Sequence, residues 1–163
     1  IHTFLASDYL RESARYSTNV TFYPFNRMYR KIPEFSMDVS QIVYEGGTVT
    51  YVEIQLAVYM GFSEIYLLGV DNTINTKKLA DGRIGVDHTG QHFYSGNDNR
   101  EIENAENAWF DLSNRERCGL YDWNDTYATA KWHTEQIGVK IFNATRGGAL
   151  EVFPRVDFDK CFG

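Results

Sequence analysis

Hydrophobic residues fall in short blocks along the chain, and two neighbouring blocks form a helix followed by a strand. Residues 49–60 are apolar on nearly every side, which predicts a buried helix. Thr50 with Glu53 three residues later forms a capping-box pattern, and Thr48 is an equally good N-cap. The apolar run Glu64–Val70 follows after a short turn and is typical of a central strand in a parallel sheet. Together these blocks indicate an α/β fold.

Weaker patterns predict the remaining elements. Helices are expected over three segments: Phe4–Arg15, Glu101–Leu112 and Asp122–Ile137. Strands are expected over three others: Asn19–Tyr23, Gln41–Tyr44 (alternatively an extended lead-in) and Val139–Asn143. Between residues 72 and 101 the sequence is rich in Gly, Asp, Asn, His and Lys, which predicts a long loop of the kind that carries function or is disordered.

Composition narrows the class of protein. With 163 residues, 43% of them apolar and 15% aromatic, residues 1–163 are expected to form a single folded α/β domain. A net charge of −6 argues against nucleic acid as a partner. Two distant cysteines, Cys118 and Cys161, favour a reducing compartment, and no signal peptide or membrane-length apolar run is present, so we expect a cytoplasmic location. Because the sequence begins with Ile1, we also expect a fragment of a larger fold.

Three turns are candidate binding sites, two of them because ligands of open α/β sheets bind beyond the carboxyl ends of the strands. The turn Gly46-Gly47-Thr48 precedes the buried helix, where backbone amides and the helix dipole suit an anion; alternatively its glycines only permit a tight turn. The other two turns follow the predicted strands, at Asp71-Asn72-Thr73 and at residues 143–148. In the latter, Arg146 is either a phosphate or carboxylate ligand or a surface ion-pair partner.

Histidines supply the other candidate chemistry. His92 and His88 lie in the long polar loop, where a histidine serves as a general base, a metal ligand or an ordinary loop residue. A metal site would combine them with Asp71 and Asp87, but no ligand motif links these residues, and no metal is expected. His133 lies beside Trp132 in a predicted helix and is expected to be structural.

Residues 46–71, GGTVTYVEIQLAVYMGFSEIYLLGVD, resemble a segment of bacterial sialyltransferases of lipooligosaccharide assembly. The same Rossmann-like core occurs in the 6-hydroxymethylpterin diphosphokinase-like family and in flagellin-modifying proteins, whose later N-x-[ST]-x-GG turn is similar to NATRGG at residues 143–148. The resemblance runs in order over about Tyr44–Phe153. It implies a Rossmann-like three-layer fold with a mostly parallel sheet, of which this chain is the carboxyl-terminal part.

The resemblance also implies roles for individual residues. Those expected at the nucleotide or substrate are Gly46, Gly47, Thr48, Gly69, Val70, Asp71, Asn72, Asn143, Thr145, Arg146 and Gly147. Thr48 and its neighbours would contact the phosphates, and Gly69-Val70-Asp71 the ribose or base. The segment HTGQH matches a His-x-x-x-His segment of the sialyltransferases, which makes His92 the general base that deprotonates the acceptor hydroxyl. The reaction would be direct displacement from a nucleotide-activated sugar, CMP-linked in the sialyltransferases, without metal or other cofactor.

Two departures from the family pattern qualify these expectations. No tyrosine lies between Tyr66 and Tyr94, so leaving-group stabilisation is expected from Arg146 or Tyr94, or else the reaction differs. No Gly-x-Gly-Pro-Ser turn occurs in residues 1–43, which is consistent with a missing amino-terminal region of the same protein.

The leading hypothesis is therefore a bacterial glycosyltransferase of surface polysaccharide synthesis that acts on a nucleotide-sugar and a glycan acceptor. The alternatives are a diphosphokinase of the pterin kinase-like branch, which would use ATP and Mg²⁺, and a non-catalytic module that binds a nucleotide or partner. Peripheral membrane association and homo-oligomer formation stay open.

Overall fold

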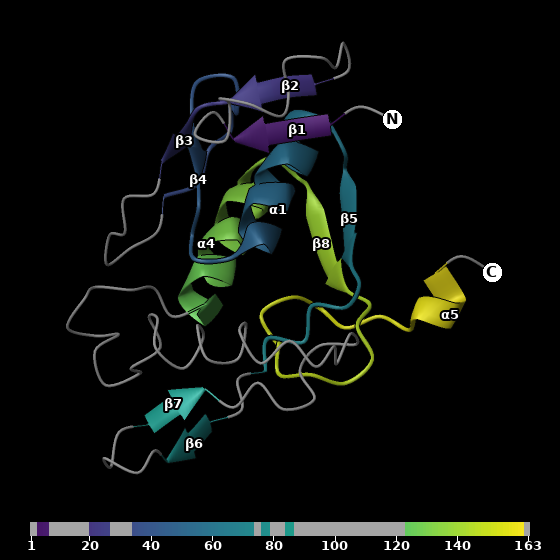
Figure 1. Ribbon diagram of the computed structural model, residues 1–163. Helices are drawn as coiled ribbons and strands as arrows, with labels where there is room; N and C mark the ends of the chain where they lie inside the picture. Colours follow the sequence, from purple (N-terminus) through teal and green to yellow (C-terminus); the bar gives the residue numbers. More distant parts are fainter. Residues whose placement is uncertain are drawn as a thin grey trace.

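The computed structural model describes residues 3–6, 20–26, 34–73, 76–78, 84–86 and 123–161. These residues form a mixed α/β structure with short parallel strands (Figure 1). The strands are β1 (Thr3–Ala6), β2 (Val20–Tyr23), β3 (Phe25–Asn26), β4 (Val43–Tyr44), β5 (Glu64–Leu67), β6 (Thr76–Lys78), β7 (Ile84–Val86) and β8 (Lys140–Asn143). The helices are α1 (Val49–Tyr59), α4 (Trp123–Gln136) and α5 (Phe158–Cys161).

The strands pair two by two. β1 pairs with β2, β3 with β4 and β5 with β8, each in parallel, whereas β6 and β7 form an antiparallel pair. In the central pair Glu64 is opposite Lys140 and Leu67 is opposite Asn143. Parallel pairing of β5 with β8 requires the chain between them to cross over, and α4 provides the last part of that connection.

The core lies where α1 and α4 pack against one face of the β5–β8 pair (Figure 1). Leu67 and Ile141 point into this face, while Tyr66 and Phe142 stack on the opposite face with ring centroids 5.1 Å apart. The buried members of the cluster are Phe35, Tyr51, Ile54, Val58, Leu67, Tyr127, Ala130, Ile141, Leu150 and Phe153. The central-strand pattern predicts that both faces of β5 are buried, and this is wrong, because Tyr66 is 38% exposed. Within the described residues, helices cover only the face of β5 that carries Leu67.

Helix α1 has the buried character that its apolar sequence predicts. Its buried residues are Tyr51, Val52, Ile54, Gln55 and Val58. Thr48 is the N-cap residue, with extended backbone angles (φ −151°, ψ 141°) and no side-chain capping bond, so the capping box predicted for Thr50 and Glu53 does not start the helix. Gly61 ends it in the left-handed region (φ 84°), as expected.

Three other expectations need correction. Residues 4–6 belong to strand β1 rather than to a helix, because their backbone pairs with β2, and such pairing outweighs a weak helical pattern. β5 ends at Leu67 because Gly69 adopts φ 77° and turns the chain away from the ladder. The predicted long loop after Asn72 contains the β6–β7 pair. The helix expected over Glu101–Leu112 lies outside the described residues.

No helix in the described part of the chain is both long enough and apolar enough to span a membrane.

Candidate functional site

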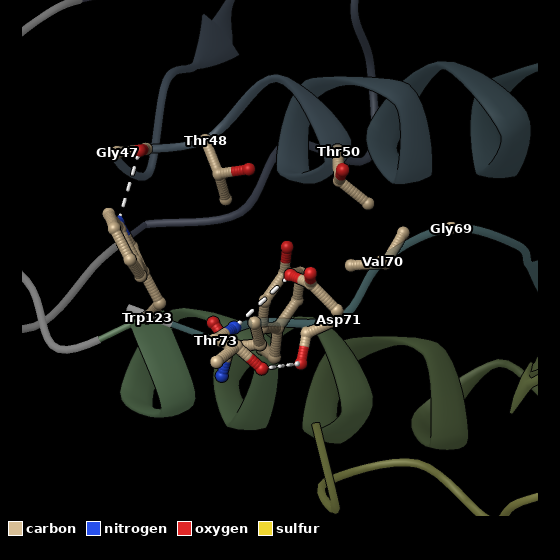
Figure 2. Close-up of a pocket in the computed structure, with 10 residues that line it drawn as sticks. Gly47, Thr48, Thr50, Gly69, Val70, Asp71, Thr73 and Trp123 are labelled. Atoms are coloured by element: carbon tan, nitrogen blue, oxygen red, sulfur yellow. Dashed lines mark hydrogen bonds between the residues drawn. The ribbon is translucent and has the colours of Figure 1, made fainter. Parts of the chain in front are cut away.

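An open pocket of about 270 Å³ lies between the start of α1, the residues that follow β5 and the start of α4 (Figure 2). It is lined by Gly47, Thr48, Thr50, Gly69, Val70, Asp71, Asn72, Thr73, Trp123 and Tyr127. Two of the three turns that the sequence singles out therefore meet in one place. Most of the residues expected to contact the nucleotide or substrate in these two turns line the pocket: Gly47, Thr48, Gly69, Val70, Asp71 and Asn72. The exception is Gly46, which is buried behind the pocket surface.

The turn before α1 depends on glycine. Gly46 (φ 58°) and Gly47 (φ 79°) both adopt left-handed conformations that other residues rarely accept. A Cβ on Gly46 would also collide with the Tyr51 ring and would lie 2.8 Å from Thr126 Cγ2. The packing of Gly46 gives a structural reason for glycine at this position, and it brings the Gly47–Thr48 backbone to the rim of the pocket.

Helix α4 holds this turn from the other side. The Thr126 hydroxyl donates to the Gly46 carbonyl at 3.0 Å, and Trp123 Nε1 donates to the Gly47 carbonyl at 3.2 Å. Thr126 is fully buried, so its hydroxyl needs this acceptor. Two successive carbonyls of the turn are therefore fixed by side chains one helical turn apart on α4.

The first turn of α1 presents an environment that favours an anion. The first amides of any helix lack partners within it, and the helix dipole adds a partial positive charge at the same end. Thr48 and Thr50 bring their hydroxyl groups to the same side (Figure 2). Among the described residues that line the pocket none carries a basic side chain, and there the start of α1 supplies positive potential through its amides, hydroxyl groups and dipole.

The turn after β5 contributes a carboxylate. Asp71 is exposed, and its Oδ1 accepts the Thr73 amide at 3.1 Å, which orients the carboxylate at the rim. Asn72 has a positive φ of 52°, uncommon for a residue other than glycine, and its Nδ2 donates to Asn124 Oδ1 at 3.0 Å. This last bond ties the β5 turn to the first turn of α4.

The turn after β8 lies behind the pocket and supports it. The Thr145 hydroxyl accepts the Val70 amide at 3.0 Å, and the Asp71 carbonyl accepts the Ala149 amide at 2.6 Å. A Cβ on Gly148 would lie 2.6 Å from Asp71 Cα, so only glycine allows the two turns to approach so closely. Asn143 is buried and donates to the Leu150 carbonyl at 2.8 Å. Asn143 and Thr145 thus shape the Asp71 turn without lining the pocket.

Arg146 and Gly147 also lie outside the lining. The Arg146 guanidinium pairs with both carboxylate oxygens of Asp159 at 2.8 and 2.7 Å, which is the surface ion-pair alternative. The Gly147 carbonyl accepts Arg155 NH1 at 2.7 Å. Arg155 also forms an ion pair with Glu151. The hydrogen bond and the positive charge of Arg155 lower the pKa of Glu151. A phosphate ligand role for Arg146 would require release of its pair with Asp159.

The histidines with predicted roles differ in what the structure describes. His92 and the neighbouring residues Asp87, His88 and Tyr94 lie outside the described residues. His133 is half-buried on α4, where it stacks on Phe35 with centroids 5.3 Å apart. Burial lowers the pKa of His133, since a charged imidazole is poorly solvated there. These contacts agree with a structural role for His133.

The sequence predicts a helix over Asp122–Ile137 but does not identify Trp123 or Tyr127 as pocket residues. Tyr127 does pack inward, edge-on to Phe153 at 5.9 Å, and also reaches the pocket. Trp123 begins α4, and the available signal was its position at a helix start that follows a polar loop. Among the described residues no group of three or more His, Cys, Asp or Glu side chains is placed to hold a metal ion.

Comparison with known proteins adds no family: no protein-family profile, curated protein or solved structure matches this chain.

Proposed function

We propose that this pocket binds the nucleotide part of an activated sugar, and that the protein is a glycosyltransferase of the sialyltransferase-like type. The observation that supports this most strongly is the meeting of the α1 amino terminus with Asp71 in one pocket. The finer parts of the proposal are a Rossmann-like three-layer fold and a role in surface polysaccharide synthesis, which rest on the resemblance of residues 46–71 and 143–148. A cytoplasmic location is proposed from the two distant cysteines, Cys118 and Cys161.

The phosphate is assigned to the Gly47–Thr50 end of the pocket. Backbone amides at a helix start bind phosphate oxygens without any basic side chain, and the dipole contributes in the same direction. The Thr48 hydroxyl makes no capping bond, so it is available as a further donor to a phosphate oxygen. Gly47, which lines the pocket and has no side chain, lets the backbone approach the ligand closely, as glycines do in phosphate-binding turns.

The ribose is assigned to Asp71. Carboxylates after a parallel strand accept hydrogen bonds from ribose hydroxyls in many nucleotide-binding folds. The Thr73 amide holds one oxygen of Asp71, and the second oxygen has no partner within the described part of the chain. A ligand that carries both a phosphate and a diol therefore matches the two ends of the lining.

The proposed chemistry is a single displacement. The acceptor hydroxyl oxygen forms a bond to the anomeric carbon as the bond from that carbon to the phosphate oxygen breaks. The electron pair leaves with the nucleotide, and His92 takes the hydroxyl proton. In the full protein, His92→Gln should lower turnover by about 10²- to 10⁴-fold with an unchanged nucleotide affinity, the range for general-base catalysis.

The diphosphokinase alternative makes a different demand on the pocket. Transfer from ATP needs Mg²⁺, which is held by carboxylates and by phosphate oxygens of the substrate. Asp71 is the one carboxylate among the described residues of the lining, and Asp87, the partner suggested by the sequence, lies outside the described residues. No observation favours this alternative over the glycosyltransferase.

Thermal-shift measurements with CMP, UDP, GDP and ATP, each with and without Mg²⁺, test the proposal. We expect stabilisation by CMP that does not need Mg²⁺, because a ligand that binds only the folded state raises its stability. Asp71→Asn should weaken CMP binding by roughly tenfold or more, the loss expected for a hydrogen bond to a charged acceptor. Glu135→Gln, at an exposed position near the other end of α4 and outside the described lining, is the matched control and should leave CMP binding unchanged. Stabilisation by ATP only with Mg²⁺ would favour the kinase instead.

A further inference from the structure

We propose that Trp123 recognises the base of the bound nucleotide by stacking, an inference that rests on the proposed nucleotide site. Trp123 is the first residue of α4 and lines the pocket. Figure 2 shows its indole between Gly47 and the start of α4, at the end of the pocket away from Gly69 and Val70. A large aromatic side chain therefore forms one wall at this end, and Tyr127, the other aromatic residue among the described lining, packs inward against Phe153.

The indole is held in one orientation. Its Nε1 donates to the Gly47 carbonyl at 3.2 Å. On the same side the ring lies close to the Gly47 backbone, since a Cβ there would be 3.3 Å from Nε1 and 3.5 Å from Cδ1. Turning the ring would break the hydrogen bond and lose this contact. A wall that is already fixed costs little entropy when a ligand binds.

The chemistry of the walls is complementary to the three parts of a nucleotide. Amides and hydroxyls at the start of α1 suit the phosphate, and Asp71 suits the ribose hydroxyls. Trp123 adds a flat apolar surface, and stacking of a nucleobase on an aromatic side chain tolerates any base. The inference is that Trp123 provides affinity for the ring of the ligand and not for its sugar phosphate.

A second role for Trp123 predicts a different result. Because the indole also holds the Gly47 carbonyl, it could act only by shaping the phosphate-binding turn. Removal of a positioning residue would weaken every ligand that carries a phosphate, with or without a base. Comparison of CMP with ribose 5-phosphate, which lacks the base, separates the two roles.

The experiment measures dissociation constants of CMP and ribose 5-phosphate by calorimetry for the wild-type chain, Trp123→Leu and Trp123→Phe. We expect Trp123→Leu to weaken CMP by roughly 5- to 150-fold, the measured worth of one base–aromatic stack, and to leave ribose 5-phosphate within twofold. Trp123→Phe keeps an aromatic ring and should recover part of the CMP affinity. Trp132→Leu is the matched control, because Trp132 is on the same helix but is 58% exposed and does not line the pocket.

Each result decides a different claim. Equal weakening of CMP and ribose 5-phosphate in Trp123→Leu would overturn stacking and leave the nucleotide site intact. Unchanged CMP affinity in Trp123→Leu would also overturn it. A wild-type chain that binds neither ligand would overturn the proposed function, and the role of Trp123 with it.

Fluorescence keeps the inference testable if Trp123→Leu does not fold. Both Trp132→Phe and Trp123→Phe retain Trp109, so the comparison isolates Trp123: CMP should quench the tryptophan emission of Trp132→Phe and should quench that of Trp123→Phe much less. Equal quenching in the two variants would contradict stacking on Trp123.

Discussion

Gly46 shows how one residue without a side chain sets the position of the candidate phosphate site. Its positive φ and its contact with Tyr51 and Thr126 allow the turn to fit between α1 and α4. We expect Gly46→Ala to destabilise the fold by about 2–4 kcal/mol, the sum of left-handed strain and overpacking. Gly61→Ala is the control: it has a similar φ of 84° but nothing within 4 Å, so it should cost only about 1 kcal/mol. Urea unfolding measures both, and equal losses would contradict the packing argument.

Gln55 is the buried polar residue that ties β4 to α1, on either side of the glycine turn. Its Oε1 accepts the Ser36 and Tyr44 amides at 3.0 and 3.1 Å, and its Nε2 donates to the Tyr44 carbonyl at 2.8 Å. Gln55→Leu removes these bonds in a fully buried place and should cost about 2–4 kcal/mol of unfolding free energy. Gln41→Leu, at an exposed position, should change it by less than about 0.5 kcal/mol. A loss at Gln55 no larger than at Gln41 would contradict the assignment.

At the scale of elements, Arg155 connects the carboxyl-terminal segment to the turn behind Asp71. Its guanidinium donates to the Gly147 and Gly148 carbonyls at 2.7 and 2.9 Å and pairs with Glu151 at 2.6 Å. Arg155→Lys loses the planar fork that makes these bonds together. We expect the Ala149 amide, which bonds to Asp71, to exchange with solvent severalfold faster in this variant. Arg146→Lys, in an exposed pair, should leave that rate unchanged; a similar change in both would contradict the connection.

The elements that the sequence predicts best are those with dense apolar patterning and a glycine stop. α1, α4 and the β5–β8 strands lie within a few residues of their expected bounds, because burial fixes both their period and their ends. The local pattern of residues 4–6 predicts a helix, whereas the structure has strand β1 there. The pairing of β1 with β2 joins segments about 17 residues apart, and a local pattern does not encode such a contact.

The sequence predicts part of the candidate site, because the ends of well-predicted elements carry several of its residues. The rule for strand ends selects Asp71, and the preference of helix starts for anions selects Thr48; the two residues do meet in the pocket. It gives no signal that Asn143 and Thr145 are turned toward the backbone rather than the pocket, or that Arg146 reaches Asp159. Those outcomes depend on hydrogen bonds within and between loops, and loop geometry is set by tertiary contacts.

At the scale of the molecule, stability should depend on pH through His133. Burial lowers its pKa below the ordinary 6.5, so the unfolded chain binds a proton more readily than the folded one. The protonation of His133 therefore has little effect on the free energy of unfolding above pH 6.5 and lowers it as the pH falls below that value. We expect His133→Phe, which keeps a ring against Phe35, to lose less stability between pH 7 and pH 5 than the wild type does. Parallel pH profiles from urea unfolding would contradict this.

The central claim is that a nucleotide occupies the pocket between α1, the β5 turn and α4, and amide chemical shifts during a titration with CMP test it most directly. The account predicts that the largest changes occur at Gly47, Thr48, Thr50, Asp71 and the Trp123 indole. Amides near the Arg146–Asp159 pair should stay unchanged. An absence of shifts at saturating CMP, or shifts centred on another part of the chain, would contradict the account.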